Sequence, residues 1–308
     1  MPALHLVIDN KADVPDNSPT MIKAVETYVR LKPDKQTTTF ICAAKSNSRY
    51  VAKALGNRPI TSYSSSDAAV FRDHLFGKGL SLGSVKRIYG SILPIINLVM
   101  REHGLEGSNA FAKTYMADWD NGQNRQPVPQ DKLIILQKAC QETDDEMRWL
   151  LALIWDTGMR LSEVPRLHSD DIILDVPIPH INLTAHLCRR LRTKSSARHI
   201  PLVGTALWAA KRLMQHDSRY TFPLCRDGQT CNANSASATL NKWMKTIIGG
   251  DYVVHSLRHS IRDRLRVVEC PSEIIDQVGG RSTTGIGHGY GKGYRIKILA
   301  KCMQKIKC

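Results

Sequence analysis

The stretch VVHSLRHSIRDRLRV, residues 253–267, decides how the second half of this chain is expected to fold. Its residues His255, Arg258 and Arg262 recur at three or four positions, which places them on one face of a helix. The opposite face is apolar at the same spacing, so the segment is predicted to be an amphipathic helix lying on a core. A cationic stripe on such a helix is either a solvated face or a phosphate contact. Repulsion between neighbouring cations favours the phosphate contact.

One arginine and two tyrosines extend this pattern. Arg160 lies in DTGMRLSEV, residues 156–164, where Gly158 is predicted to end a buried helix and Arg160 to stand at the start of the next. Tyr290 and Tyr294 lie downstream of the cationic helix. Guanidinium groups match phosphate oxygens and keep their charge, an imidazole moves protons near neutrality, and a phenol can be a covalent nucleophile. Read alone, Arg160 is equally a surface arginine, but the order of the groups predicts attack on a phosphodiester.

The charge balance indicates a polyanionic partner. The 308 residues include 43 Lys plus Arg against 28 Asp plus Glu, a formal net charge of +15 with a pI near 9.6. DNA, RNA and acidic membrane surfaces are the candidates. No acidic residue follows Asp276, whereas seven Lys and Arg residues do. This tail is either a solvated basic surface or part of the contact with the polyanion.

Membrane and secretion signals are lacking. The longest apolar run, residues 92–100, is too short to span a bilayer and contains Pro94. The N-terminus has no basic start followed by an apolar block, so no signal peptide is expected. The sequence predicts a cytoplasmic protein without a membrane partner.

The cysteines and glycines offer two alternatives that the spacing disfavours. None of the eight cysteines forms a Cys-x-x-Cys pair, so reduced thiols are expected rather than a disulfide framework or a metal site. The segment GIGHGYGKG, residues 285–293, has the glycines of a nucleotide cradle, but Gly293 follows Lys292 where Ser or Thr would ligate magnesium. The glycines beside Tyr290 instead give its phenol freedom to move.

The chain is expected to have two lobes. Residues 1–17 are predicted to be a flexible leader, 18–117 a helical domain, 118–130 a linker rich in turn residues, and 131–308 a second domain. The helices expected in the first domain are residues 18–31, 38–55, 66–77 and 81–104.

The second domain is expected to be helical with a small β-hairpin. Residues 131–142 and 145–156 are predicted helices, the latter apolar nearly all round and therefore buried. Residues 178–203 alternate around Lys194 and are predicted to form strand, turn and strand. After Tyr294, apolar positions at helical spacing predict an amphipathic tail helix.

Four segments together resemble the tyrosine recombinases of the phage-integrase family, over roughly residues 128–308. TGMRLSE resembles the first family box, which implies a catalytic arginine at Arg160 and its acidic partner at Glu163. HSLRHS resembles the second box, which implies catalytic His255 and Arg258. The implied fold is mainly α, with an N-terminal four-helix SAM-like core-DNA-binding lobe and an α+β catalytic domain.

The remaining two segments complete the resemblance. TKSSARHIPL resembles the family's β-hairpin lysine segment, which implies a general acid at Lys194. VGGRSTTGIGHGY resembles the last box, where the nucleophilic tyrosine lies nine residues after a His or Trp; counting from Arg281 leads to Tyr290. Arg281 departs from the family pattern. It is expected to support the scissile phosphate, with His288 as a rival for that role.

The resemblance implies a site-specific DNA recombinase that cleaves and rejoins an attachment site through a 3′-phosphotyrosyl link, with no metal, ATP or other cofactor. It implies a tetramer on DNA, whose tail helix packs onto a neighbouring protomer, accessory DNA-bending or directionality proteins, and a location at the nucleoid. Two alternatives stay open. One is a prophage product that binds DNA but has lost catalysis, which the departure at Arg281 favours; the other is a type IB topoisomerase-like enzyme that relaxes DNA.

Overall fold

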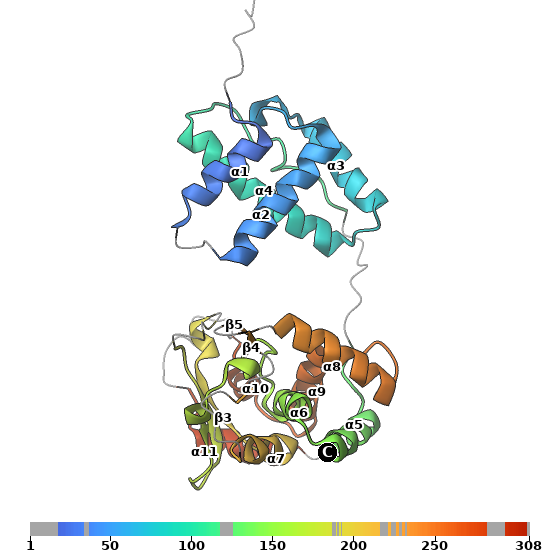
Figure 1. Cartoon of the computed structure of the whole chain (residues 1–308), viewed down its shortest axis with the longest axis vertical. Coiled ribbons are helices and arrows are strands. Elements are labelled where there is room, and N and C mark those ends of the chain that lie inside the picture. Colours follow the sequence, from blue (N-terminus) through green and yellow to red (C-terminus); the bar gives the residue numbers. More distant parts are fainter. Residues whose placement is uncertain are drawn as a thin grey trace, which may run out of the picture. The chain divides into compact units, whose positions relative to one another are not determined.

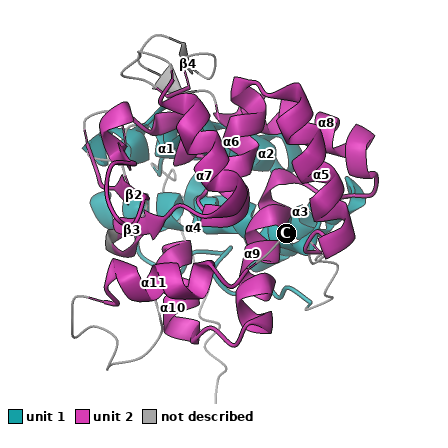
Figure 2. Cartoon of the chain, turned by 90° about the horizontal axis from the view of Figure 1, so that it is seen from below, with its two compact units in different colours: residues 1–123 teal, residues 124–308 magenta. Residues whose placement is uncertain are grey.

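The computed structural model shows two compact units, residues 1–123 and 124–308 (Figure 2). Each unit has its own hydrophobic core. The structure describes residues 18–33, 37–117, 126–186, 189, 191, 193–215, 221–222, 226–227, 230–231, 233–281 and 293–306. No helix among these residues is long and apolar enough to cross a membrane.

The first unit is a group of helices, shown in blue to cyan in Figure 1. Its core is aromatic at the centre, where Phe71, Tyr89 and Phe111 are all buried and contact one another in tilted or edge-on pairs. The third helix begins with a capping box, in which Ser64 accepts from the Asp67 amide while Asp67 accepts from the Ser64 amide. The elements are α1 (Met21–Arg30), α2 (Thr38–Leu55), the 3₁₀ turn η2 (Ile60–Ser62), α3 (Ser65–Gly77) and α4 (Leu82–Glu102).

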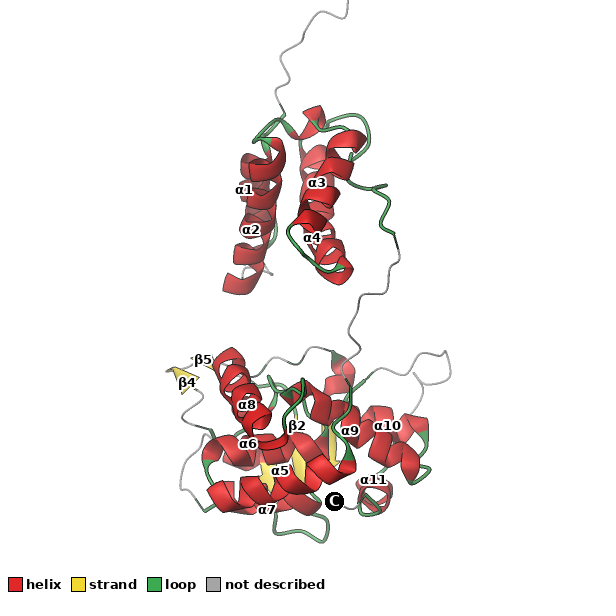
Figure 3. Cartoon of the chain, turned by 90° about the vertical axis from the view of Figure 1, so that its right-hand side faces the viewer, coloured by secondary structure: helices red, strands yellow, loops and turns green. Residues whose placement is uncertain are grey.

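The second unit combines helices with a small antiparallel sheet (Figure 3). The strands lie in the order β1-β2-β3, and Ile181 pairs with both Ile172 and Ile200, which buries an apolar row. A predominantly helical chain with a small sheet is therefore confirmed. The helices are α5 (Gln130–Thr143), α6 (Glu146–Thr157), α7 (Gly204–Leu213), α8 (Ala233–Ile248), α9 (Val254–Val267), α10 (Ser272–Gly279) and α11 (Ile296–Met303). The strands are β1 (Ile172–Ile173), β2 (His180–Leu183), β3 (Arg198–Pro201), and a separate pair, β4 (Arg226–Asp227) and β5 (Thr230–Cys231).

Helix α6 forms the centre of this unit, in contact with α5, α7, α8 and α9 (Figure 1). All eight residues from Leu150 to Thr157 are buried, as its apolar sequence predicts. Gly158 ends the helix with φ 61, and a Cβ there would lie 3.2 Å from Ile261 Cγ2 on α9. The left-handed glycine thus lets the segment that follows pass close to α9.

The tail helix α11 packs within its own unit. Leu299 and Met303 are buried in the core, and the helix contacts β3. The expected contact of this helix with a neighbouring protomer stays a prediction.

Candidate active site

Glu163 organises the segment that follows α6. Its Oε1 accepts from Arg160 Nη1 at 2.8 Å, and its Oε2 accepts from the Arg160 backbone amide at 2.9 Å. Oε2 also accepts from Arg198 Nη2 at 3.2 Å. Burial acts to raise the pKa of Glu163, but Arg198 and Arg160 together outweigh it and hold that pKa below its ordinary value. Glu163 is therefore an ionised, buried support for two guanidinium groups.

The placement of Arg160 corrects one expectation from the sequence. Arg160 does not begin an α-helix: a turn follows it, and then a short 3₁₀ helix, η3 (Val164–Arg166). Glu163 accepts hydrogen bonds from both the side chain and the backbone amide of Arg160, and these two bonds close the turn. Arg160 is thus oriented by a carboxylate three residues away rather than by the start of a helix.

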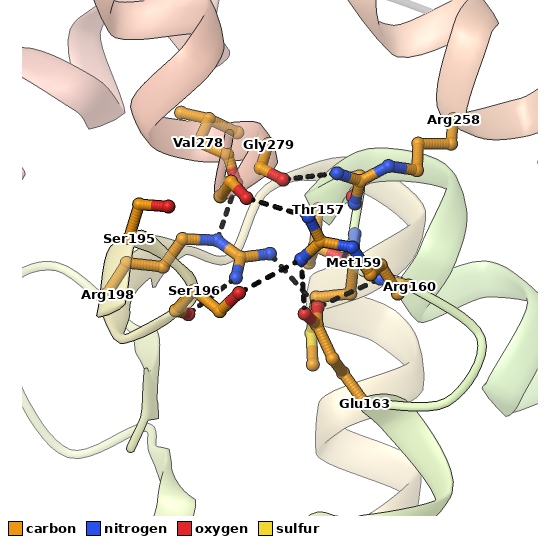
Figure 4. A network of polar contacts seen from close by, with 12 residues as sticks. Thr157, Met159, Arg160, Glu163, Ser195, Ser196, Arg198, Arg258, Val278 and Gly279 are labelled. Atoms are coloured by element: carbon orange, nitrogen blue, oxygen red, sulfur yellow. Dashed lines mark hydrogen bonds and ion pairs between the residues drawn. The ribbon is translucent and has the colours of Figure 1, made fainter. Parts of the chain in front are cut away.

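Three arginines converge on three consecutive carbonyls at the end of α10 (Figure 4). The last carbonyls of a helix have no partner within the helix and lie at its negative end, so cations stabilise them. The bonds run from Arg198 Nε to Val278 O at 2.8 Å, from Arg258 Nη2 to Gly279 O, and from Arg160 Nη2 to Gly280 O at 2.9 Å. These arginines come from β3, from α9 and from the turn after α6.

Arg258 joins the two glycine turns of the site. It is 5% exposed, and its Nη1 donates to Gly158 O while Nη2 donates to Gly279 O. Burial first, and then the charges of Arg160 and Arg198, lower the pKa of Arg258 to about 9. The guanidinium thus carries its charge among other cations, and a bound anion would relieve that repulsion.

Arg281 borders the same turn. It follows Gly280, and its backbone amide donates to Asp276 O at 2.9 Å. A Cβ on Gly279 would lie 3.8 Å from Arg281 Cγ and 3.8 Å from Arg258 Nη2, so the two side chains approach one glycine. Burial and the nearby Arg262 lower the pKa of Arg281. The predicted role of Arg281 stays a prediction, but the structure places it beside the arginine group.

His255 lies in the first turn of α9 and is exposed. With Arg258 and Asn241 it lines a cavity of about 200 Å³. Asn241 Oδ1 accepts from the Val254 amide at 2.8 Å, which caps the start of α9 from α8. His255 therefore stands at an open edge of the site, one helical turn from the buried Arg258.

Lys194 is placed only in part, and Tyr290 and His288 lie outside the described residues. The backbone of Lys194 lies in a 3₁₀ turn, η5 (Lys194–Ser196), between β2 and β3, so this part of the expected hairpin is a short helical turn. The Lys194 side chain lies outside what the structure describes. The turn itself is fixed to the site, because Arg160 Nη1 donates to Ser196 Oγ at 3.2 Å.

Sequence reasoning missed Arg198, although a signal was present. Arg198 and Ile200 alternate along β3 and so share one face of the strand, Leu202 follows the end of the strand at the same spacing, and all three are buried. A charged residue at the same two-residue spacing as buried apolar residues is expected to be buried with them and to need a partner of opposite charge. Arg198 makes such a contact with Glu163. Among the described residues, no group of three or more His, Cys, Asp or Glu side chains is placed to hold a metal ion.

Comparisons with known proteins agree with this geometry. A model of the phage integrase family matches residues 128–288. The Tn1549 transposon integrase, solved with circular intermediate DNA, is similar in structure with a TM-score of 0.68 at 16% identity, covering 92% of this chain and 98% of that chain. The lambda integrase, solved as a tetramer bound to a Holliday junction, has a TM-score of 0.67 at 14% identity, covering 89% and 78%. No curated protein matches the chain in sequence.

Proposed function

Because the chain belongs to the phage integrase family of tyrosine recombinases, we propose that it is a site-specific recombinase that cleaves and rejoins DNA at an attachment site. The observation that carries the proposal is the convergence of Arg160, Arg258 and Arg281 around one glycine turn. That convergence gives a fixed group of positive charges, which suits the phosphate of a DNA strand.

Arg160 and Arg258 are proposed to clamp the scissile phosphate. A guanidinium has five N–H donors, and in Arg258 the bonds to Gly158 and Gly279 use two of them. The remaining donors are proposed to bind non-bridging phosphate oxygens. Since the backbone carbonyls already fix both guanidiniums, little reorganisation is needed as charge builds in the pentavalent transition state.

The remaining predicted residues are proposed to move protons and form the covalent bond. The Tyr290 phenol loses its proton to His255 and attacks phosphorus, while the bond from phosphorus to the 5′-oxygen breaks and that oxygen takes a proton from Lys194. The product is a 3′-phosphotyrosyl link and a free 5′-hydroxyl, and attack by a 5′-hydroxyl reverses the step. Arg281 supports the phosphate. One phosphodiester is exchanged for another, so neither ATP nor a metal ion is needed in this scheme.

Residues 18–117 are proposed to be a core-DNA-binding domain, joined to the catalytic domain 131–308 through the linker 118–130. Support comes from α2, where Lys45, Arg49 and Lys53 are exposed at intervals of four residues. A stripe of cations along one side of a helix suits a contact with the sugar–phosphate backbone.

The DNA-bound state is proposed to be a tetramer located at the nucleoid, assisted by accessory DNA-bending or directionality proteins. A phage or prophage origin fits the family. The net charge of +15 supports a polyanionic partner.

The test is incubation of the protein with nicked suicide duplexes made from the DNA that flanks its own gene. We expect a covalent adduct that survives denaturing electrophoresis. Specific binding to these duplexes without an adduct would favour the catalytically decayed DNA-binding protein, which the departure at Arg281 supports. Relaxation of supercoiled DNA that lacks the flanking sequence would favour the topoisomerase-like alternative.

A further inference from the structure

Arg198 is among the most buried charged side chains of the described structure. Its side chain is 2% exposed, and all three of its guanidinium nitrogens already donate to acceptors within the chain. Burial lowers the pKa of Arg198, and the charge of Glu163 opposes that effect. Removing a charge from water is costly unless partners satisfy it. The position of Arg198 must therefore be understood from what it binds.

Each nitrogen of the Arg198 guanidinium donates to a different segment of the chain (Figure 4). Nη2 donates to Glu163 Oε2 at 3.2 Å, after α6. Nη1 donates to Ser196 O at 2.8 Å, in the turn η5. Nε donates to Val278 O at 2.8 Å, at the end of α10. A planar guanidinium holds these donors at fixed angles, so it fixes the three segments relative to one another.

Each of these segments carries a residue of the proposed cleavage site. Glu163 orients Arg160 through two hydrogen bonds. The turn that contains Ser196 begins with Lys194. Val278 is followed by Gly279, whose carbonyl accepts from Arg258. In the part of the chain that the structure describes, no hydrogen bond joins Arg198 to the Arg160 or Arg258 side chain, but Arg198 binds a residue close to each of the three proposed catalytic positions.

Gly280 shows how closely this arrangement is packed. It has φ 58, a conformation that favours glycine, and a Cβ there would lie 2.5 Å from Arg198 Nη1. The guanidinium therefore lies directly against the glycine turn. The backbone conformation favours glycine at this position, and a larger residue would have to displace the Arg198 guanidinium.

We propose that Arg198 is a positioning residue for DNA cleavage, which holds the Lys194 turn, the Glu163–Arg160 pair and the end of α10 in one fixed arrangement. The inference rests on the function proposed above and deepens it. Its consequence is kinetic: loss of Arg198 displaces the general acid and the clamp together, while the surface that binds DNA is unchanged.

The variant Arg198→Met removes the three hydrogen bonds and keeps most of the side-chain volume. At saturating enzyme, we expect the single-turnover rate of adduct formation on the suicide duplex to fall about 10²-fold, the usual effect of a misplacement of about 1 Å. The dissociation constant for DNA should be unchanged. Arg198→Lys should not restore the rate, because one ammonium cannot bind three diverging acceptors.

Arg189 provides a matched control. It is 1% exposed and donates to both oxygens of Asp171, at 2.6 and 2.9 Å, so its loss also breaks a buried ion pair. None of its acceptors is a proposed catalytic residue. Arg189→Met should lower the melting temperature as Arg198→Met does, but should leave the cleavage rate per folded molecule unchanged.

A duplex with sulfur in place of the bridging 5′-oxygen separates the two expected causes of the Arg198→Met defect, the displaced general acid Lys194 and the displaced arginine clamp. A thiolate leaves without a proton from Lys194, so the share of the Arg198→Met defect that comes from the displaced lysine turn should be regained. Arg258→Lys should not be rescued in this way, because its defect lies in the clamp.

Three results would overturn the inference. The first is an Arg198→Met variant that cleaves DNA at the rate of the natural protein. The second is an Arg198→Lys variant that recovers this rate. The third is an equal loss of cleavage rate per folded molecule in Arg198→Met and Arg189→Met. The proposed function fails in a different manner, since the wild-type protein would then form no adduct at all, and the role of Arg198 would fall with it.

Discussion

Arg160 and Arg258 donate to adjacent carbonyls of a single turn, those of Gly280 and Gly279. The spacing of the two guanidiniums is therefore set by one peptide unit, whose length is nearly invariant. A backbone template of this kind is stiffer than a contact between two long side chains. It explains how residues from distant parts of the sequence can present one phosphate site.

The first prediction concerns the nucleophile. Gln277 accepts from the Tyr294 amide at 2.8 Å and donates to the Tyr294 carbonyl at 3.0 Å, which anchors the backbone of Tyr294 to α10. Tyr290→Phe should therefore abolish the covalent adduct and leave DNA binding intact, whereas Tyr294→Phe should still form it. The measurement is adduct yield on denaturing gels beside a gel-shift assay. An adduct that is absent only in Tyr294→Phe would show the assignment to be wrong.

The second prediction concerns the clamp. Arg160→Ala and Arg258→Ala should each slow cleavage by about 10²–10³ or more, the usual loss for one donor to a developing oxyanion. Arg258→Lys should fail as well, because an ammonium cannot bind the Gly158 and Gly279 carbonyls and a phosphate together. Rates come from single-turnover cleavage. Near-normal cleavage by Arg258→Lys would remove Arg258 from the proposed clamp.

The third prediction concerns Arg281. Because it borders Gly279 beside Arg258, Arg281→Ala should slow adduct formation by about 10–10³, and His288→Ala should change little. Replacement by the usual family residues gives the decisive comparison. Greater activity of Arg281→His or Arg281→Trp than of the natural protein would mark Arg281 as a lesion and favour the decayed prophage product.

The fourth prediction concerns charge. Affinity for DNA should fall steeply with salt, and replacing Lys45, Arg49 and Lys53 by Gln should reduce the slope of log K against log salt by about 2–3, at about 0.9 for each phosphate that is no longer neutralised. The exposed pair Lys297 and Lys301 on α11 is the control. Changing that pair should lower the slope only if the tail helix touches DNA. An unchanged slope in the α2 variant would exclude that helix from the DNA interface.

The fifth prediction concerns pH. The pKa of Glu163 is lower in the folded protein than its ordinary value of 4.5, because Arg198 and Arg160 outweigh the effect of burial. Glu163 therefore contributes stability above pH 4.5 that is lost as the pH falls through the lower folded pKa. Glu163→Gln should cost about 3–5 kcal/mol at neutral pH, the usual cost of removing one partner of a buried ion pair.

The acid dependence gives the measurement for Glu163. Urea unfolding should show that the Glu163→Gln variant loses less stability on acidification than the natural protein does. Asp170→Asn changes an exposed carboxyl nearby and serves as the control, with little effect at neutral pH. An identical acid dependence in Glu163→Gln and the natural protein would contradict a lowered pKa for Glu163.

Local pattern in the sequence was sufficient for much of the fold. Helices α2, α6 and α9 follow their predicted ranges closely, because apolar periodicity and capping residues act within a few positions. The family was predicted from four short segments and is confirmed, as is a recombinase of the tyrosine type. Helices α7 and α8 were not predicted. In α8 the buried residues Ala236, Leu240, Met244 and Ile248 recur every four positions, a signal that the sequence interpretation missed. Contacts with α5 and α9 stabilise the helix.

The sequence by itself determined which chemical groups this protein has and in what order: the arginines, the histidine, the lysine and the tyrosines, each in a recognisable segment. Only the tertiary structure decided that Arg198 joins three of those segments, that Arg160 lies in a turn closed by Glu163, and that α11 packs on its own unit. The physical reason is the range of the interactions. Helix periodicity and caps are set by neighbours along the chain, whereas buried guanidiniums bind whichever carbonyls and carboxylates the folded core brings to them.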